Sequence, residues 1–146
     1  MTVPSGFEGH FRTTPVTNPW EPIYSRRADD STELGLVMAE AHCNGRGFLH
    51  GGVIAALSDN AMGLSFVQLA QRNSDDTASA FGAVTVGLSV DYLSSARIGQ
   101  WLQIAPRVLR AGNSLGFVDA VVTCDGSVVA RCNATFKLAT QRATRR

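Results

Sequence analysis

The stretch HCNGRGFLHGGVIAALSDNAMGLSFVQLA, residues 42–70, decides the fold of this chain of 146 residues. A glycine-rich loop leads into a long apolar segment that runs from Val53 to Ala70. A helix that is apolar on nearly every side is either buried or in a membrane. A membrane span needs about 20 predominantly apolar residues with few or no charges, and this segment is interrupted by Ser58, Asp59, Asn60, Ser65 and Gln68. We therefore predict one long core helix with the rest of the chain wrapped around it.

Asp59 is the residue of this helix that needs an explanation. An isolated carboxylate removed from water costs so much free energy that it normally finds a partner or becomes protonated. No Lys or Arg lies between Val53 and Gln71, so a partner has to come from another element. Asp59 either lies on a solvated edge of the helix beside Asn60, or is a catalytic or binding carboxylate at a site that another element lines.

Length and charge narrow the class of protein. A chain of this length can bury a real core as one domain, and we expect a single domain over residues 1–146, with an irregular lead-in over 1–22 and a basic tail over 140–146 that contains Arg142, Arg145 and Arg146. The formal net charge of +1 gives no field that would favour nucleic acid or an anionic membrane as a partner. No charged segment followed by an apolar one opens the chain, so we do not predict a signal peptide.

The three cysteines indicate the compartment. Cys43, Cys124 and Cys132 form no Cys-x-x-Cys pair, and any disulfide scheme leaves one of them unpaired. This usage is typical of reduced thiols, and we expect a cytoplasmic protein. Cys43 has a loop position that would suit a nucleophile, but nothing else in the sequence supports that role.

The remaining segments predict strands. Residues 23–27 are short enough for a first strand, residues 29–32 mark a turn, and residues 33–41 fit a strand or a helix by periodicity; we assign a strand because they lead directly into the glycine-rich loop. A polar loop is expected over residues 71–77. The segment Ala83–Tyr92 then alternates with period two, so that one face carries Val84, Val86, Leu88, Val90 and Tyr92.

Three further strands are expected over residues 100–110, 115–123 and 128–138. Pro106 indicates a bulge or an edge in the first of them, and Asp125-Gly126 is a strong hairpin signal before the last. We therefore predict an α+β fold in which an antiparallel meander of long strands curves around the helix. Such a sheet leaves edges and an outer face to cover, which favours a homo-oligomer.

The motifs His42-x-Asn44, Gly47-x-Leu49-His50-Gly51-Gly52 and Asp59, followed by Ala83–Val86 and by Asp91-Tyr92-Leu93 with Ala96, resemble the hotdog-fold acyl-CoA thioesterases, in particular their phenylacetate-degradation (PaaI-type) branch. The similarity covers most of the chain from about residue 30 onward. Ser95 departs from the pattern, because many relatives have proline there. The resemblance implies a hotdog fold in which the long central helix is wrapped by the sheet, and an enzyme that hydrolyses an acyl- or aryl-acyl-CoA to free CoA and a carboxylic acid. It implies no cofactor, since CoA is part of the substrate, and a homotetramer built as a dimer of dimers.

Two groups can carry thioester hydrolysis. The N–H of Gly51 lies near the helix N-terminus, where unpaired N–H groups and the helix dipole favour a developing negative charge; alternatively, the glycines only permit a sharp turn into the helix. Asp59 is the candidate nucleophile or general base. Asp59 follows Gly51 by eight residues, which places it about 12 Å further along a helix, whereas a reacting carbonyl lies about 3 to 3.5 Å from its nucleophile. The site must therefore combine Asn44, His50 and Gly51 of one subunit with Asp59 and Thr85 of a neighbour, and the family is built in this way.

The remaining site residues follow from family position. Thr85 would hydrogen-bond the attacking water or the Asp59 carboxylate, unless it is an ordinary strand threonine. Asn44 would orient the water or the thioester, although by composition it is a turn residue, and His50 would order the loop or contact the thioester. Substrate-binding roles are expected for Gly52, Tyr92, Arg97 and Arg110, where the arginines suit the CoA phosphates or are solvated surface charges. His10 and His42 are interpreted as structural, and no metal site is expected because the helix carries Asp59 far from both His42 and His50.

Two other functions fit the same fold. A hotdog hydratase or dehydratase usually pairs a catalytic His with an Asp or Glu in a different local pattern. An acyl-CoA-binding sensor without catalysis would normally need a DNA-binding segment, and this chain has no room for one.

Overall fold

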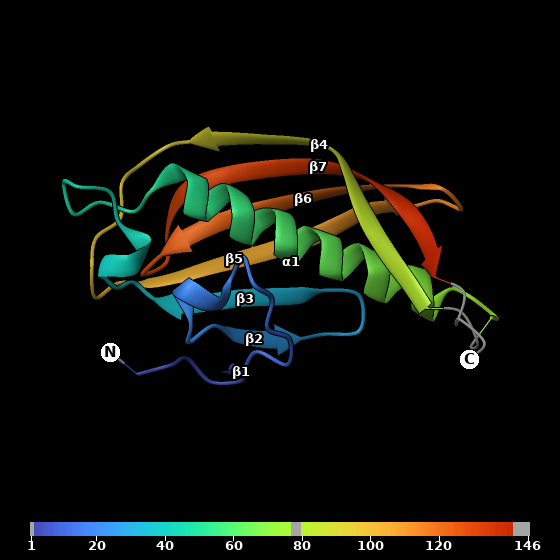
Figure 1. Ribbon diagram of the computed structural model, residues 1–146, viewed down its shortest axis with the longest axis horizontal. Coiled ribbons are helices and arrows are strands. Elements are labelled where there is room, and N and C mark those ends of the chain that lie inside the picture. Colours follow the sequence, from blue (N-terminus) through green and yellow to red (C-terminus); the bar gives the residue numbers. More distant parts are fainter. Residues whose placement is uncertain (1, 77–79, 142–146) are drawn as a thin grey trace.

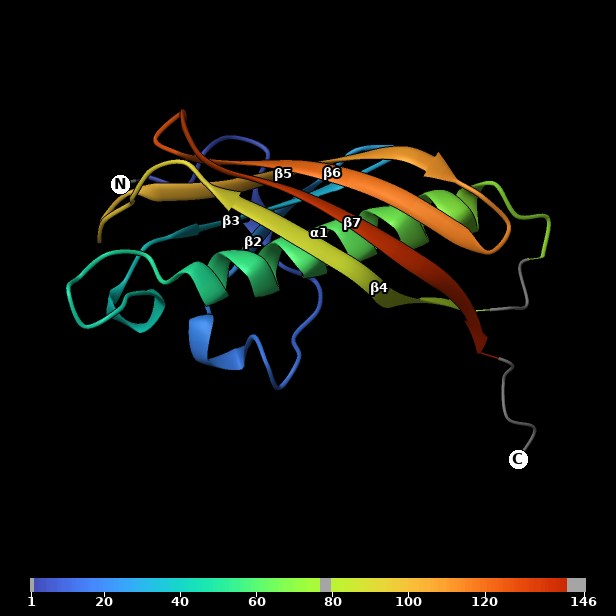
Figure 2. The ribbon, with the colours of Figure 1, turned by 90° about the horizontal axis from the view of Figure 1, so that it is seen from above.

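The computed structural model describes residues 2–76 and 80–141 and shows one long helix held against one curved sheet (Figure 1). The sheet has the order β1-β2-β3-β5-β6-β7-β4, and every neighbouring pair is antiparallel. Seen from above, the long strands cross one side of the helix and leave its other side uncovered by the sheet (Figure 2). The elements are β1 (Glu8–Gly9), the 3₁₀ helix η1 (Asn18–Trp20), β2 (Tyr24–Arg27), β3 (Thr32–Val37), the 3₁₀ helix η2 (Glu40–His42), α1 (Gly51–Arg72), β4 (Ala80–Tyr92), β5 (Trp101–Ala111), β6 (Leu115–Cys124) and β7 (Ser127–Gln141). The predicted α+β architecture is confirmed.

Helix α1 begins two residues earlier than the apolar segment indicated. Its N-cap is His50, whose Nδ1 accepts a hydrogen bond of 2.8 Å from the Gly52 N–H. This bond satisfies one of the N–H groups that the first helical turn leaves without a partner. Arg72 lies in the last turn, where a cation interacts favourably with the helix dipole.

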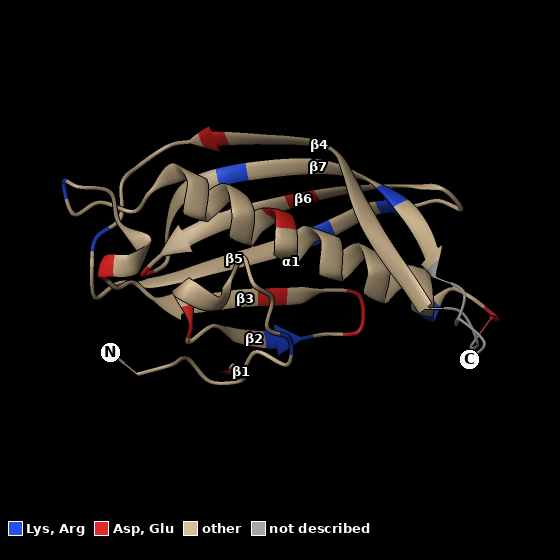
Figure 3. Ribbon diagram, viewed as in Figure 1, with Lys and Arg blue, Asp and Glu red and all other residues tan. Residues whose placement is uncertain are grey.

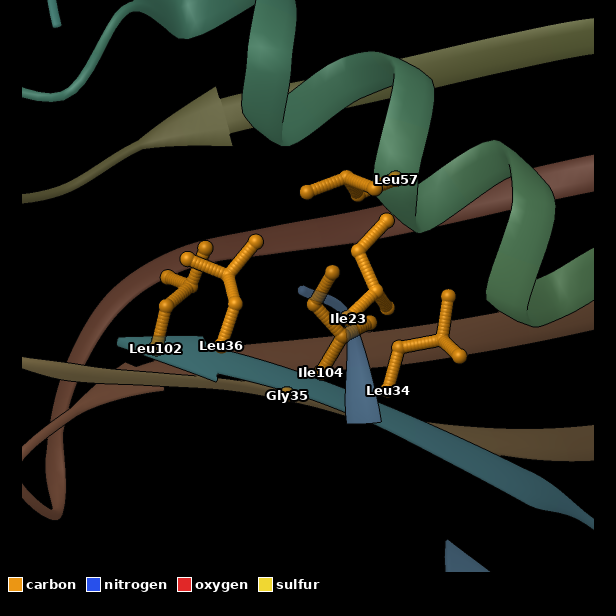
Figure 4. Close-up of a pocket in the computed structure, with 7 residues that line it drawn as sticks. All are labelled: Ile23, Leu34, Gly35, Leu36, Leu57, Leu102 and Ile104. Atoms are coloured by element: carbon orange, nitrogen blue, oxygen red, sulfur yellow. The ribbon is translucent and has the colours of Figure 1, made fainter. Parts of the chain in front are cut away.

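One face of α1 packs into the core of the sheet. Leu57 points from the helix towards Ile23, Leu34, Leu36, Leu102 and Ile104 (Figure 4), and all six side chains are at most 2% exposed. By length and composition alone α1 could cross a membrane, but half of its most apolar window is buried inside the fold. The burial is that of a core helix, as the polar interruptions predicted.

Two polar residues of α1 tie the helix to the start of β3. Ser65 Oγ accepts a hydrogen bond of 3.0 Å from the Thr32 N–H, and Thr32 Oγ1 donates to Gln68 Oε1 at 2.6 Å. Ser65 and Gln68 are therefore structural. Asp59 and Asn60 lie instead on the half-buried part of the helix surface.

The order of the strands corrects the predicted meander. Of the four long strands β4 to β7, β5, β6 and β7 follow one another in space, whereas β4 lies beyond β7 at the sheet edge and β3 pairs with β5. The strand predicted over 33–41 ends at Val37, and η2 follows it. Thr77 of the predicted loop and Arg142, Arg145 and Arg146 of the predicted tail lie outside the described residues.

Pro106 lies in a part of β5 that pairs with only one neighbouring strand, so its missing N–H removes few ladder hydrogen bonds. The ladder between β3 and β5 stops at the pair Leu34 and Ile104, so Pro106 has a strand partner only on the β6 side, and the register shifts between Val108 and Arg110. Proline is tolerated at such edges and bulges, and both predicted features are present. The Asp125-Gly126 hairpin is also confirmed, with the positive φ at both residues that its tight turn requires.

A β-bulge in β4 overturns the predicted single apolar face of this strand. Thr85 pairs with Phe136, but the next pair joins Gly87 to Thr135, so that Val86 is the extra residue. Thr85 and Tyr92 are seven positions apart, and a regular strand would point them to opposite faces. Both nevertheless hydrogen-bond to residues of α1. The inserted residue shifts the alternation by one position and brings Thr85 to the helix side.

Candidate active site

A cavity of about 370 Å³ lies between α1, β4 and the N-terminal segment. We call it the Asp59 cavity. Its polar wall is formed by Arg12, Thr14, Asp59, Asn60 and Thr85. Its apolar wall includes Leu64, Val67, Phe81 and Phe136. A concave site of this size in which several polar groups converge beside apolar side chains has the size of a small-molecule site.

Asp59 has a specific partner in this cavity. Thr85 Oγ1 donates a hydrogen bond of 2.7 Å to Asp59 Oδ1. The bond joins the middle of α1 to the edge strand β4 and fixes the orientation of the carboxylate. Figure 3 shows this charge as the red band in the middle of α1, since Asp59 is the only charged residue between 51 and 71. The structure thus places Thr85 where the resemblance implied.

A second cavity, of about 530 Å³, opens at the start of α1. We call it the helix-start cavity. The glycine-rich loop contributes Asn44, Arg46 and Phe48 to its lining, and Gly51 and Tyr92 form another part of the wall. Asp59 and Thr85 line the first cavity and not this one. Within one chain Asn44 and Gly51 therefore line a different cavity from Asp59 and Thr85, as the distance along the helix required. His50, the fifth predicted catalytic residue, lines neither cavity.

Gly51 offers the donor that an oxyanion needs. Its N–H, at the first helical position, donates to none of the described residues, whereas the N–H of Gly52 is already bound to His50 Nδ1. The Tyr92 hydroxyl donates to the Gly51 carbonyl oxygen at 2.7 Å. A Cβ at position 51 would lie 3.0 Å from Tyr92 Cζ, so only glycine leaves this ring its place. The geometry favours Gly51, and not Gly52, as the donor to a substrate.

The glycine-rich loop is held by its own side chains. Asn44 Oδ1 accepts hydrogen bonds from the N–H groups of Arg46, at 2.9 Å, and Phe48, at 3.3 Å. The Nδ2 group of Asn44 donates to no residue within 2–76 and 80–141, so it remains available to a substrate or water. His50 acts as the N-cap of α1, which agrees with the predicted ordering role.

His42 is a structural residue, as predicted. It is 2% exposed, its Nδ1 accepts from the Ala39 N–H at 2.9 Å, and its Nε2 lies 3.0 Å from the Trp20 carbonyl oxygen. Its backbone carbonyl accepts from the His50 N–H at 2.9 Å. These bonds connect η1, η2 and the start of α1.

The two predicted arginines lie in different places. The Arg97 guanidinium carbon is 5.3 Å from the centroid of the Phe48 ring, beside the helix-start cavity. Arg110 is exposed on β5 opposite Phe117 and lines neither cavity. Arg46 was missed by the sequence reasoning, although its position between Gly45 and Gly47 of the quoted loop was the available signal.

None of the three cysteines is an activated nucleophile. Burial, with the nearby Glu40, raises the pKa of the Cys43 thiol. Burial also raises the pKa of Cys132, and it raises the pKa of Cys124 to about 12. All three are free and are therefore neutral thiols at physiological pH.

Comparison with known proteins agrees with this geometry. The sequence profile of the thioesterase superfamily matches residues 46–131. A Pseudomonas aeruginosa protein that carries the name of an esterase, PA0474, is 32% identical over 139 residues, which cover 94% of this chain and 98% of that protein.

Two further relatives carry more specific names. Human acyl-coenzyme A thioesterase 13 is 31% identical over 98 residues, covering 66% of this chain and 64% of that protein. The crystal structure of smu.793 from Streptococcus mutans, bound to acetyl CoA, has a TM-score of 0.66 and 28% identity, and the match covers 79% of this chain and 86% of that one. The fold, the two cavities and these matches agree with the resemblance seen in the sequence, and the chain belongs to the thioesterase superfamily, with its hotdog fold.

Proposed function

We propose that the chain hydrolyses acyl-CoA thioesters at an active site that two copies of it build together. The observation that carries this proposal is the Asp59 carboxylate, oriented by Thr85 in a substrate-sized cavity, while the free Gly51 N–H lies in a separate one. The names of the human relative and of the acetyl-CoA-bound neighbour support acyl-CoA as the substrate class.

In the proposed reaction the thioester carbonyl lies between Asp59 of one subunit and Gly51 of the partner subunit. Asp59 attacks the carbonyl carbon, or removes a proton from a water that does so. The Gly51 N–H at the helix N-terminus stabilises the oxyanion, an interaction that contributes about 100- to 1,000-fold in other enzymes. The C–S bond then breaks and the CoA thiolate takes up a proton that derives from water. If Asp59 attacked directly, a second water cleaves the acyl–Asp59 anhydride; in both routes water supplies the second oxygen of the carboxylic acid.

The edge strand β4 supports the second copy that this site requires. It pairs with β7 on one side and with no strand of the described chain on the other. Val84 is 54% exposed and Val86 is 63% exposed, and an exposed apolar edge strand is a template for another chain. We propose a dimer that covers this edge, and we keep the tetramer and the cytoplasmic location as parts of the same proposal.

The decisive experiment is thiol release across a panel of acyl-CoA substrates, from short aliphatic to aryl-acyl. Hydrolysis frees one CoA thiol per turnover, whereas hydration of a double bond and simple binding free none. Thiol release by the wild-type protein, abolished in Asp59→Asn, would support the proposal. Substrate binding without thiol release would contradict it.

A further inference from the structure

The N-terminal segment between β1 and η1 is a fixed part of the Asp59 cavity. It runs along the side of α1 that the sheet leaves uncovered (Figures 1 and 2). At one end the His10 N–H donates to the Ile23 carbonyl at 2.8 Å. At the other end Thr17 is 2% exposed, and the Trp20 carbonyl oxygen of η1 lies 3.0 Å from His42 Nε2. The residues between these two anchors are therefore held against the cavity.

Arg12 lies between the anchors and brings a cation to the cavity wall. Its guanidinium makes no hydrogen bond or ion pair with the residues that the structure describes, and it forms no ion pair with Asp59 of the same cavity. Among the residues that the structure describes, no other Lys or Arg lines this cavity. A planar guanidinium has five donors in a fork that fits a carboxylate with two parallel hydrogen bonds.

The lining of the helix-start cavity indicates which part of an acyl-CoA would contact Arg12. The helix-start cavity is lined by Arg46 and lies beside Arg97, and these cations suit the phosphates of CoA. With the thioester carbonyl held between the two cavities, the acyl group is left to the Asp59 cavity. Its apolar wall extends along α1 from Asp59 to Val67, about 12 Å at the rise of a helix, which suits a chain of several carbons.

We infer that Arg12 binds a carboxylate at the far end of the acyl group, so that ω-carboxyacyl-CoA thioesters are the preferred substrates. This inference rests on the proposed function and names its substrate class. Leu64, Val67 and Phe81 would contact the methylene chain, and Arg12 would select the charged end.

The test compares adipoyl-CoA with hexanoyl-CoA, which have the same six-carbon chain with and without the terminal carboxylate. The measured quantity is the ratio of kcat/KM for adipoyl-CoA to that for hexanoyl-CoA. We expect the wild-type ratio to exceed one and to fall about tenfold or more in Arg12→Gln, because one charge-assisted pair is lost. Arg12→Lys should keep part of the preference, and Arg12→Glu should reverse it.

Arg107→Gln is the matched control. Arg107 is an exposed arginine of β5 that pairs with Asp119 of β6, and it lines neither cavity. Its loss should therefore leave the ratio at the wild-type value. Melting temperatures would show that all variants are folded. An unchanged kcat/KM ratio in Arg12→Gln, or an equal loss of kcat/KM on both substrates, would overturn the inference about Arg12. Thiol release by the wild type would in that case still support the proposed function. Absence of thiol release from every panel substrate would overturn both.

Discussion

The hydroxyl of Thr85 and the carboxylate of Asp59 are 2.7 Å apart, although their residues are 26 positions apart in the chain. The contact exists because the bulge at Val86 returns Thr85 to the helix side of β4. It orients the half-buried Asp59 carboxylate, which forms no ion pair within residues 2–76 and 80–141.

Replacing Asp59 by Asn should remove the nucleophile or general base without unfolding the protein. We expect kcat/KM to fall about 100- to 10,000-fold, the usual contribution of such a group. Steady-state thiol release measures this loss, and Asp119→Asn on the opposite face of the sheet is the control with the same change of charge. Asp59→Ala should be at least as stable as the wild type, because it removes a charge from a partly dry site. Wild-type turnover in either variant would show that another group is the base.

Thr85→Val keeps the shape of the side chain but removes the hydrogen bond to Asp59. We expect kcat to fall by about 10- to 150-fold, because a hydrogen bond to a charged group contributes about 1.5 to 3 kcal/mol. Thr85→Ser keeps the hydroxyl and should retain most of the activity. A serine variant as impaired as the valine variant would assign the effect to packing of the methyl group.

Gly51→Ala should reduce both stability and activity, because the new Cβ meets the Tyr92 ring at 3.0 Å. Overpacking of a well-packed core costs about 1 to 3 kcal/mol, and we expect the lower end of this range because Tyr92 is 54% exposed and its side chain can shift. The double variant Gly51→Ala/Tyr92→Ala should recover part of the stability, since the ring has been removed. Urea denaturation of the four proteins of this cycle measures the coupling free energy, and strictly additive effects would mean that the two residues do not share this space.

The composite site predicts complementation between two inactive variants. A dimer of Asp59→Asn with Gly51→Asp has one site that carries both lesions and one that carries neither. Random reassembly of equal amounts should therefore give about one quarter of the wild-type activity. Activity no higher than that of the separate variants would show that each chain builds its own site.

The stability of the protein should depend on pH through His10. Burial lowers the pKa of His10 below its ordinary value of 6.5. The charge of Glu21 raises this pKa, and the charges of Arg12 and Arg27 lower it further. Both ring nitrogens are buried without a partner among the described residues. The neutral ring is thus favoured in the fold, so its contribution is complete above about pH 6.5 and is lost as the pH falls below it.

Urea denaturation at pH 7.5 and pH 5 measures this contribution. His10→Gln should lose less stability than the wild type between these two pH values, because it has no ring to protonate. An equal loss in both proteins would assign the pH dependence to other groups.

The sequence by itself determined the central helix, the turn before β7 and the chemical types of the proposed site. These features depend on local patterns: the apolar segment after the glycine-rich loop, the Asp125-Gly126 dipeptide, and a lone carboxylate at Asp59. The distance along the helix also sufficed to separate Gly51 from Asp59, because the helical rise is fixed.

Only the tertiary structure decided where these groups lie relative to the sheet. Strand order is a choice between non-local pairings, so the predicted meander missed that β4 lies at the edge beside β7. One inserted residue at Val86 reverses the two faces of a strand, and the alternation of side chains does not show where the insertion falls. Arg12 stands in a segment without periodicity, and its place at the Asp59 cavity follows from the hydrogen bonds that its neighbours His10 and Trp20 make with Ile23 and His42.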